Sequence, residues 1–460
     1  MRQVPLVAGH PLLGSLKELQ EDVLAAYLRA RGSVGDVVRF QAGPPGMRTE
    51  VYGVFSAEGV QQVLASRSAN FRKDNPTYTE IRESLGNGLL TSQDDEYVFQ
   101  RRMVQPLFTR RRVNEYAAAV HAETIRSVSD WHTRPDGVVD VSATMTEFAL
   151  RTVSRILFGA DIEAAVDVVR RRFPVIGESV LRRGVSPVRL PRTWPTPANR
   201  RTLTAQRELY EICDRIIARR TAAGEAGTDE ADDMISLLVR ARDEDGSRLS
   251  ADAVRDQILI FLLAGYETTA TTIACALHLL AGDAGVRARV RAEVDGVLAG
   301  RTPGAADVEA LPYLNRVLKE TMRVYPSVAI MGRRAVADTE VDGFRIPAGA
   351  DVYLAPWVTH RHPAYWTRPD DFDPEHFTPE AEAARPRYAW FPFGGGPRAC
   401  IGQHFSMLEA GIALAAVLQR FDLEAHDPPG RRAPVDLGMA LRPAGPLLVR
   451  VRPRTTEAVA

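Results

Sequence analysis

The sequence predicts a mainly α-helical protein with a smaller β-rich portion, and hydrophobic periodicity and chain length support this class. Apolar residues recur with helical spacing from about residue 95 to about residue 335. Alternating, β-branched runs occupy part of the stretch from about residue 30 to about residue 70 and return after residue 336. With 460 residues, of which 45% are hydrophobic, the chain can bury a large core in one or two domains.

The N-terminal part and the helical body differ in pattern. Residues 18–31 form an amphipathic segment, whereas residues 37–40 and 50–55 are β-prone runs. Inside the body, proline and glycine predict breaks at Pro174, over 184–197 and over 224–227.

The stretch 256–275 predicts a buried helix, because it is apolar on nearly all faces. Glu267 and Thr268 lie in its middle. Burying such an acid costs free energy unless it is paired or functional.

The last third of the chain alternates between turns, strands and one helix. Residues 336–352 read as short strands with a turn at Asp342-Gly343. A proline-rich loop over 363–386 leads to a glycine-dense segment, and a helix follows over about 401–420. Strand-like runs close the chain.

Composition limits the class of partner and the compartment. The chain has 58 basic and 58 acidic residues, so nothing in its charge favours nucleic acid. Basic charge is almost all arginine, which with the many Ala and Gly residues suggests a GC-rich bacterial genome. The odd, sparse set Cys213, Cys275 and Cys400 argues against a disulfide framework and for a reducing cytosol. The N-terminus shows neither a bilayer-spanning apolar run nor a signal sequence, so we expect a cytoplasmic protein without a membrane anchor.

Cys400 is a lone thiol on a glycine-dense loop, and a thiolate held in this way can be the single protein ligand of a haem iron. Three successive glycines, 394–396, allow close approach to a flat macrocycle. Nearby amides can lower the pKa of the thiol, and Arg398 can reach a propionate. The alternative is a buried structural cysteine on a glycine-rich turn.

The pattern Phe393-x-x-Gly396-x-Arg398-x-Cys400-x-Gly402 resembles the haem-binding loop of the cytochrome P450 family. Further landmarks in the family's order extend the resemblance over nearly the whole chain. It implies one compact domain over 1–460 with its haem-ligand loop at 393–402, a haem b held by the Cys400 thiolate, and Phe393 beside the cofactor. No flavin-binding unit follows the loop, so no bound flavin is expected.

The run Ala264-Gly265-x-Glu267-Thr268 is similar to the oxygen-activating segment of that family. The resemblance implies that Ala264 and Gly265 make room for O2 above the iron. Thr268 would then hydrogen-bond the oxygen, and Glu267 would help relay protons from solvent. The alternative is a Glu–Thr pair that only satisfies backbone groups inside a core helix.

Glu320 and Arg323 match the family's Glu-x-x-Arg pair, a structural ion pair on one helix face. His376 stands where the family usually has a third, arginine partner. A neutral histidine donates one hydrogen bond where a guanidinium offers a fork, so this network is in doubt. A surface histidine without a role is the alternative.

Propionate contacts follow from the same resemblance. Tyr97 replaces the family's usual tryptophan, and its hydroxyl can still donate a hydrogen bond. Arg101, Arg333 and Arg398 are the expected cationic partners, although Arg334 leaves the register of Arg333 open. Each of them, taken alone, could be a solvated surface arginine.

The resemblance places the substrate pocket between residues 72–92, 173–200 and several apolar residues. Those apolar residues suit a small hydrocarbon-like substrate, although such stripes are more often core than pocket. The first of these segments also carries charged and polar residues, Arg72, Lys73, Asp74, Tyr78, Glu80 and Arg82, which could meet a polar end of the substrate or face water. The apolar pocket candidates are Phe261, Leu262, Val328, Ala329, Ile330 and Met439.

Electrons are expected from a separate ferredoxin or flavodoxin with its reductase. A basic run could dock that partner, or could be a solvated helix face; it comprises Arg101, Arg102, Arg110, Arg111 and Arg112. The implied function is a monooxygenase that inserts one atom of O2 into a terpenoid, polyketide or fatty-acid-like compound, in bacterial secondary metabolism. The alternatives are a haem-thiolate enzyme for desaturation, ring closure or coupling, and a non-catalytic haem-binding protein.

Overall fold

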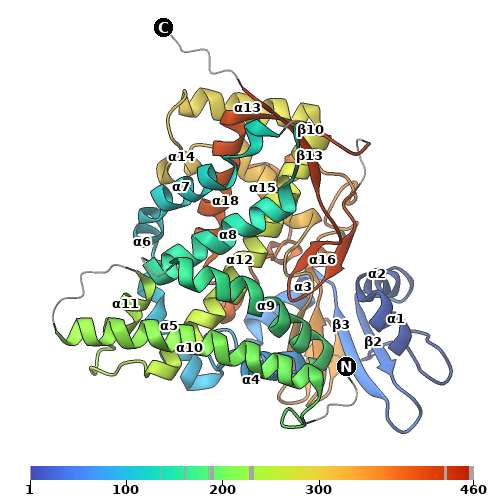
Figure 1. The fold of residues 1–460 in the computed structure, drawn as a ribbon. Helices are drawn as coiled ribbons and strands as arrows, with labels where there is room; N and C mark the ends of the chain where they lie inside the picture. The colour runs from blue at the N-terminus through green and yellow to red at the C-terminus, as the bar shows by residue number, and fades with distance from the viewer. Residues whose placement is uncertain are drawn as a thin grey trace.

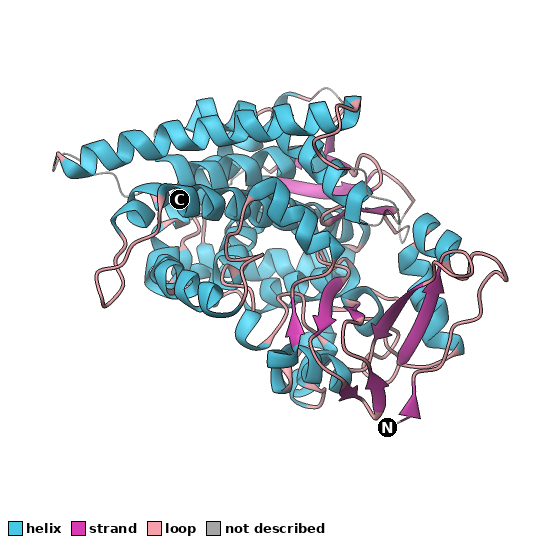
Figure 2. Ribbon diagram, turned by 90° about the horizontal axis from the view of Figure 1, so that it is seen from below, coloured by secondary structure: helices cyan, strands magenta, loops and turns pink. Residues whose placement is uncertain are grey.

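Helices make up most of the molecule, and most of the strands gather on the side that holds the N-terminus (Figures 1 and 2). The computed structural model describes residues 2–134, 136–159, 162–184, 186, 191–226, 233–428 and 432–454. The expected class, mainly α with a smaller β portion, is confirmed. The longer helices are α2 (Val23–Ser33), α4 (Pro76–Leu85), α5 (Asp94–Val104), α7 (Ala117–Ser127), α8 (Val141–Phe158), α9 (Ile162–Gly184), α10 (Pro197–Glu225), α12 (Ala251–Gly282), α13 (Ala284–Leu298), α15 (Pro312–Val324) and α18 (Gln403–Arg420). The shorter ones are α1 (Leu16–Glu21), α3 (Ala57–Gln61), α6 (Arg110–Glu115), α11 (Met234–Arg240), α14 (Ala305–Glu309), α16 (Pro356–Thr359) and α17 (Pro379–Ala383).

The strands form one five-stranded sheet and three smaller ones. The large sheet has the order β2-β3-β9-β6-β4, and the others are β1-β8-β7, β10-β13-β5 and the hairpin β11-β12. Chain segments far apart in sequence therefore pair, as β3 does with β9. The strands are β1 (Arg2–Gln3), β2 (Val37–Ala42), β3 (Thr49–Val54), β4 (Phe71–Arg72), β5 (Val138–Asp140), β6 (Met331–Ala335), β7 (Thr339–Val341), β8 (Phe344–Ile346), β9 (Asp351–Leu354), β10 (Phe421–Ala425), β11 (Val435–Leu437), β12 (Leu441–Pro443) and β13 (Leu448–Pro453).

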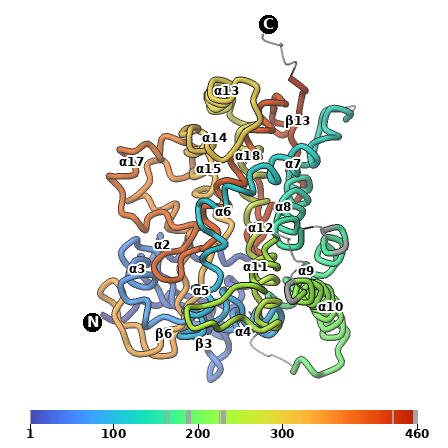
Figure 3. Tube along the Cα trace, turned by 90° about the vertical axis from the view of Figure 1, so that its left-hand side faces the viewer, coloured from blue at the N-terminus to red at the C-terminus, as the bar shows by residue number. Residues whose placement is uncertain are grey.

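Helix α12 runs through the centre of the helical region, between α8 and α18 (Figure 3). Ser250 caps it by accepting a hydrogen bond from the Ala253 amide. Among the described residues it is the one helix long and apolar enough to cross a membrane, but 78% of its apolar stretch is buried inside the protein. Its all-round apolarity therefore serves the core, as the sequence predicts.

Several local expectations are confirmed and one is wrong. Strands β2 and β3 form where alternation predicts them, and α9 and α10 are separated between Gly184 and Pro197. The break expected at Pro174 does not occur, because α9 continues through it and buries Phe173 and Ile176 against the core. The amphipathic segment 18–31 lies in two consecutive helices, α1 and α2, because Asp22 starts α2 as a new N-cap.

Candidate active site

The loop that carries Cys400 is closed by its own backbone and lies against a segment more than 300 residues away. The Cys400 amide donates to the Phe393 carbonyl at 2.9 Å. Gly396 has a positive φ of 63°, and a Cβ there would meet the carbonyl oxygen of Leu64 at 1.9 Å. Glycine is therefore required at 396 both for its conformation and for its contact.

Cys400 is exposed although protein surrounds it, so its thiol is accessible to a bound group. Burial raises the pKa of this thiol, and the Gly402 amide with the charges of Lys73 and Arg101 offsets the rise only in part. The expected lowering of the pKa is thus wrong for the free thiol. A coordinating metal ion deprotonates a thiol outright, so the raised pKa does not oppose ligation.

Four cations surround the cysteine loop without carboxylate partners among the described residues. Arg333 is 5% exposed and donates to its neighbour's carbonyl, and Arg398 donates to the Ser92 carbonyl at 2.9 Å. Arg101 donates to Ala399 O at 3.1 Å. Burial lowers the pKa of Lys73, and the charges of Arg333 and Arg398 lower it further. This cluster fits a buried dianion such as the two propionates of a haem.

Haem also fits the donor set. No group of three or more His, Cys, Asp or Glu residues gathers to hold a metal ion in the part of the chain that the structure describes. A lone thiolate therefore suits an iron whose other ligands come from a macrocycle.

Two residues near these cations differ from expectation. The Tyr97 hydroxyl donates to the Pro397 carbonyl at 2.7 Å, and the Tyr97 ring stacks under the Arg398 guanidinium at 3.6 Å. Tyr97 thus positions Arg398 in place of the expected direct propionate bond. Lys73, which sequence reasoning assigned to the pocket or to solvent, is buried within the cation cluster. No local pattern marks it, because its neighbours come from distant segments.

Ala264 and Thr268 share one face of α12 and keep accessible surface in the middle of this buried helix. The Thr268 hydroxyl donates to the Ala264 carbonyl at 2.7 Å. Because its hydrogen is committed there, its lone pairs are left to accept a hydrogen bond. Gly265 lies on the face of α12 that packs against α8, since a Cβ there would approach Val153 of α8 at 3.0 Å. Its small size serves helix packing and not the expected space above iron.

Glu267 points toward the β11-β12 hairpin. The Tyr266 hydroxyl donates to its Oε1 at 2.9 Å, the Ala440 amide bonds to it, and Arg442 lies nearby. Burial raises the pKa of Glu267, and its effect is larger than the lowering of that pKa by these three contacts. A carboxyl whose pKa is raised is better suited to hold and pass on a proton than an ordinary carboxylate. The sequence marks Glu267 but not Ala440 or Arg442, which lie 173 and 175 positions further on.

Glu320 and Arg323 form a fully buried ion pair on α15, with nitrogen–oxygen distances of 2.7 and 2.8 Å. The remaining donors of Arg323 bond to three carbonyls, those of His360, Pro369 and Asp371. Burial alone would raise the pKa of Glu320, but the bonds from Arg323 and His376 outweigh it and lower the pKa.

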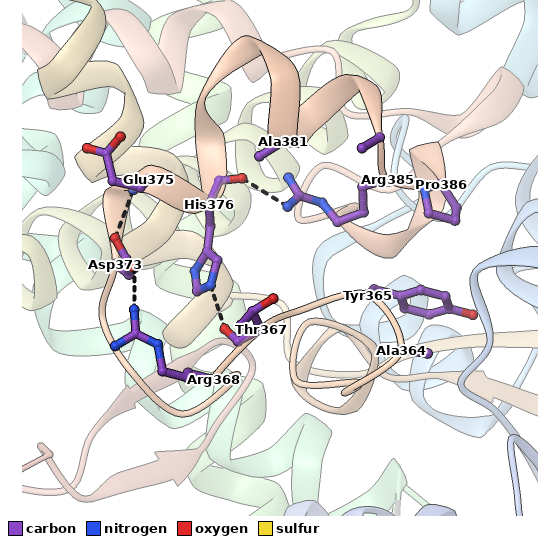
Figure 4. Close-up of a pocket in the computed structure, with 11 residues that line it drawn as sticks. Ala364, Tyr365, Thr367, Arg368, Asp373, Glu375, His376, Ala381, Arg385 and Pro386 are labelled. Atoms are coloured by element: carbon purple, nitrogen blue, oxygen red, sulfur yellow. Dashed lines mark hydrogen bonds and ion pairs between the residues drawn. The ribbon is translucent and has the colours of Figure 1, made fainter.

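His376 completes this network in the place of an arginine. Its Nδ1 lies 3.1 Å from Glu320 Oε1 and its Nε2 lies 2.7 Å from the Thr367 carbonyl. The ring therefore lies between the Glu320 carboxylate and the Thr367 carbonyl. Figure 4 shows His376 beside Thr367 and Arg385 in a surface pocket, with Arg385 donating to the His376 carbonyl. His376 is thus in contact with the Glu320–Arg323 pair and is not a surface histidine without a role.

The apolar pocket candidates divide by exposure. Leu262 and Ala329 are at most 1% exposed and belong to the core, which contradicts a role in lining the pocket. Phe261 packs edge-on against Phe108 at 5.3 Å between ring centres. Val328, Ile330 and Met439 are half-buried and retain accessible surface.

The charged candidates are mostly paired. The segment 72–92 contains helix α4, and its Glu80 is 2% exposed and bonds to Arg183 and Arg192. Glu80 therefore contributes a buried ion pair rather than a free polar group. In the basic run three arginines have acidic partners: Arg102 with Asp243, Arg110 with Glu309 and Arg112 with Glu115.

Comparisons with known proteins show which family the chain resembles over its length. The family model described as cytochrome P450 matches residues 4–450. The chain is 36% identical over 449 residues to cyclooctatin synthase of Streptomyces melanosporofaciens, with 97% of this chain and 94% of the relative covered. Pentalenene oxygenase of Streptomyces avermitilis is 32% identical, with 99% of each chain covered.

A second protein of S. melanosporofaciens, cyclooctat-9-en-7-ol 5-monooxygenase, is 33% identical over 90% of this chain and 88% of its own length. Among solved structures, the heme domain of cytochrome P450DA superposes with a TM-score of 0.86 at 28% identity. That superposition covers 99% of this chain and 98% of the other.

Replacing Gly396 with alanine is expected to lower the haem content of the purified protein, because the added Cβ meets the Leu64 carbonyl. Gly394→Ala is the matched control: its φ is also positive, at 69°, but nothing lies within 4 Å of the added Cβ. Haem per protein should fall more in G396A than in G394A. Equal haem contents would show that the contact with Leu64 is not required.

Replacing His376 with alanine leaves a buried carboxylate oxygen with one donor fewer. We expect the free energy of unfolding to fall by about 1.5–3 kcal/mol, the range for hydrogen bonds to charged groups. His426→Ala, at an exposed position, should change it by less than about 0.5 kcal/mol. Denaturant titration measures both, and a loss in H376A no larger than in H426A would contradict the proposed bond.

Proposed function

The chain belongs to the cytochrome P450 family, and from that premise we propose that it inserts one oxygen atom of O2 into a terpenoid-like hydrocarbon. Membership makes it a haem-thiolate monooxygenase of secondary metabolism that uses O2, an organic substrate and a redox partner.

The observation that carries the proposal is the state of the Thr268 hydroxyl. Its hydrogen is donated to Ala264, and its accessible surface lies on the same helix face as Ala264. A threonine with only a structural role could make the same hydrogen bond to Ala264 with its hydroxyl oxygen fully buried. An accepting hydroxyl on an accessible face can instead hold a protonated group of the reacting species in place.

The protein's residues hold and surround the cofactor. When bound, haem b supplies the redox chemistry that activates O2, with the thiolate of Cys400 donating electron density to iron. Arg101, Arg333, Arg398 and Lys73 would hold its propionates, and Tyr97 would keep Arg398 oriented. Phe393 lies at the start of the same loop and fixes its closure through its carbonyl.

Glu267 would deliver protons to the space beside Thr268. Burial raises its pKa, which favours the protonated carboxyl, and Arg442 on β12 is exposed. The contacts to Ala440 and Arg442 therefore mark the side from which a proton would arrive. To donate inward, the carboxyl has to leave these contacts, which a rotation of its side chain accomplishes.

The substrate proposal rests on the relatives' names and on the apolar residues with accessible surface. Two relatives carry names that describe an unsaturated hydrocarbon, pentalenene, and an unsaturated alcohol, cyclooctat-9-en-7-ol. Val328, Ile330 and Met439 offer no charge or hydrogen-bond donor from their side chains. Such a lining suits a hydrocarbon skeleton with few polar groups.

For electron supply we propose a ferredoxin or flavodoxin with its reductase, in the cytoplasm, with no flavin bound to this chain. Arg111 is exposed on α6. It lies close in sequence to Arg101, which donates a hydrogen bond to the Ala399 carbonyl in the cysteine loop. An acidic partner would be attracted to this basic segment. The ion pairs of Arg102, Arg110 and Arg112 reduce its net charge without removing it.

Substrate class is tested by the spin-state shift of the haem on titration with candidate compounds. Terpenoid hydrocarbons and their mono-alcohols should shift the spectrum at lower concentrations than polyketides or fatty acids of similar size. The apolar lining is the physical reason, because a carboxylate loses its hydration there. Tighter binding of fatty acids would contradict the proposed class.

Thr268→Ala is expected to uncouple the reaction, measured with the compound that shifts the spectrum best. Product formed per reductant consumed should fall by roughly tenfold or more, with peroxide released instead, because proton delivery loses its hydroxyl. Thr268→Ser keeps a hydroxyl and should retain most of the coupling. Undiminished coupling in T268A would refute the role of the hydroxyl.

A further inference from the structure

The backbone carbonyl of Thr268 accepts hydrogen bonds from two side-chain hydroxyls. Thr272 Oγ1 donates to it at 3.0 Å from within the same helix. Ser327 Oγ donates at 2.8 Å from the loop that follows α15. The two hydroxyl oxygens lie 3.2 Å apart, so they converge on one carbonyl.

These bonds bear on the direction in which the helix presents Thr268. Threonine hydroxyls that bond to the carbonyl four residues back tend to bend a helix, and Thr268 and Thr272 do so in succession. Their bonds lie within α12 and move with it. Among the residues that the structure describes, only Ser327 ties this carbonyl to a different segment. Ser327 is 9% exposed, so water does not readily replace its hydroxyl.

Ser327 is itself held by the C-terminal hairpin. Its carbonyl accepts the Leu441 amide at 2.7 Å, and the Leu441 carbonyl accepts the Thr271 hydroxyl at 2.9 Å. Directly after Ser327 the chain continues into Val328 and Ile330, two of the pocket candidates with accessible surface. Ser327 thus connects three parts of the site: helix α12, the apolar loop 328–330, and the β11-β12 hairpin that contacts Glu267.

We propose that Ser327 is a positioning residue for Thr268, and that it couples displacements of the apolar loop 328–330 to the Thr268 hydroxyl. A compound that presses on Val328 or Ile330 shifts the adjacent Ser327, and the bond to the Thr268 carbonyl passes that shift to α12. The inference rests on the proposed role of Thr268 in the reaction.

Ser327→Ala tests this role because it removes only the hydroxyl. The backbone bond to Leu441 stays, and alanine fits wherever serine does. Two readouts are taken: the C–O stretching frequency of the carbon monoxide complex of the reduced protein, and peroxide released per reductant with the best spin-shifting compound. We expect the frequency to shift in the same direction as in T268A, and peroxide to rise about fivefold, the equilibrium effect of one lost buried hydrogen bond.

Thr271→Val is the matched control, since it loosens the hairpin from α12 without touching the Thr268 carbonyl. It should shift the stretching frequency much less than S327A does, because the bond from Ser327 Oγ to the Thr268 carbonyl remains. Ser327→Thr keeps the hydroxyl and should restore both readouts. In the double variant T268A/S327A the changes in frequency and in peroxide release should be less than additive, because both substitutions act through the Thr268 hydroxyl.

Three outcomes would overturn the inference. If T268A changes both readouts and S327A changes neither, Ser327 does not position Thr268, although the proposed role of Thr268 stands. If T271V shifts the frequency as much as S327A, the effect comes from general loosening of the hairpin. If T268A also changes nothing, the role of Thr268 fails and the inference fails with it.

Discussion

The buried ion pair of Glu320 and Arg323 is the interaction on which the geometry around the cysteine loop depends. Both side chains are fully buried, so neither charge is tolerated without the other. All five guanidinium donors of Arg323 are used, two on Glu320 and three on carbonyls of the chain between 360 and 371. His360 then accepts the Phe391 amide at 3.0 Å, two residues before the loop that closes on Cys400. The position of the thiol thus follows from α15 through a short series of satisfied polar groups.

Buried charge is handled in two different ways in this molecule. Glu320, Glu80 and Glu123 are each neutralised by arginines of the chain itself. The cations around the cysteine loop have only carbonyl partners or an aromatic ring among the described residues. The first arrangement is complete without a ligand, whereas the second is complementary to an anion. This contrast separates the structural ion pairs from the proposed cofactor contacts.

Local sequence was sufficient where a feature is carried by neighbouring residues. The apolar run 256–275 and the loop 393–402 were identified in this way, and both form as expected. Contacts between distant segments were not predictable: Tyr97 bonds to Pro397, Lys73 joins Arg333 and Arg398, and Ser327 bonds to Thr268. Their partners depend on tertiary packing, which no local pattern encodes. The break expected at Pro174 does not form for the same reason, since packing on both sides of Pro174 keeps α9 continuous.

The residues that surround Cys400 and Thr268 range in sequence from Lys73 to Arg442. The hairpin that contacts Glu267 and holds Ser327 is made by residues 435–443, near the C-terminal end. During synthesis, N-terminal segments leave the ribosome and begin to fold long before these residues exist. A nascent chain therefore cannot complete the contacts of Glu267 and Ser327 until residues 435–443 have been synthesised. A cofactor that needs these contacts would have to bind after that hairpin has formed.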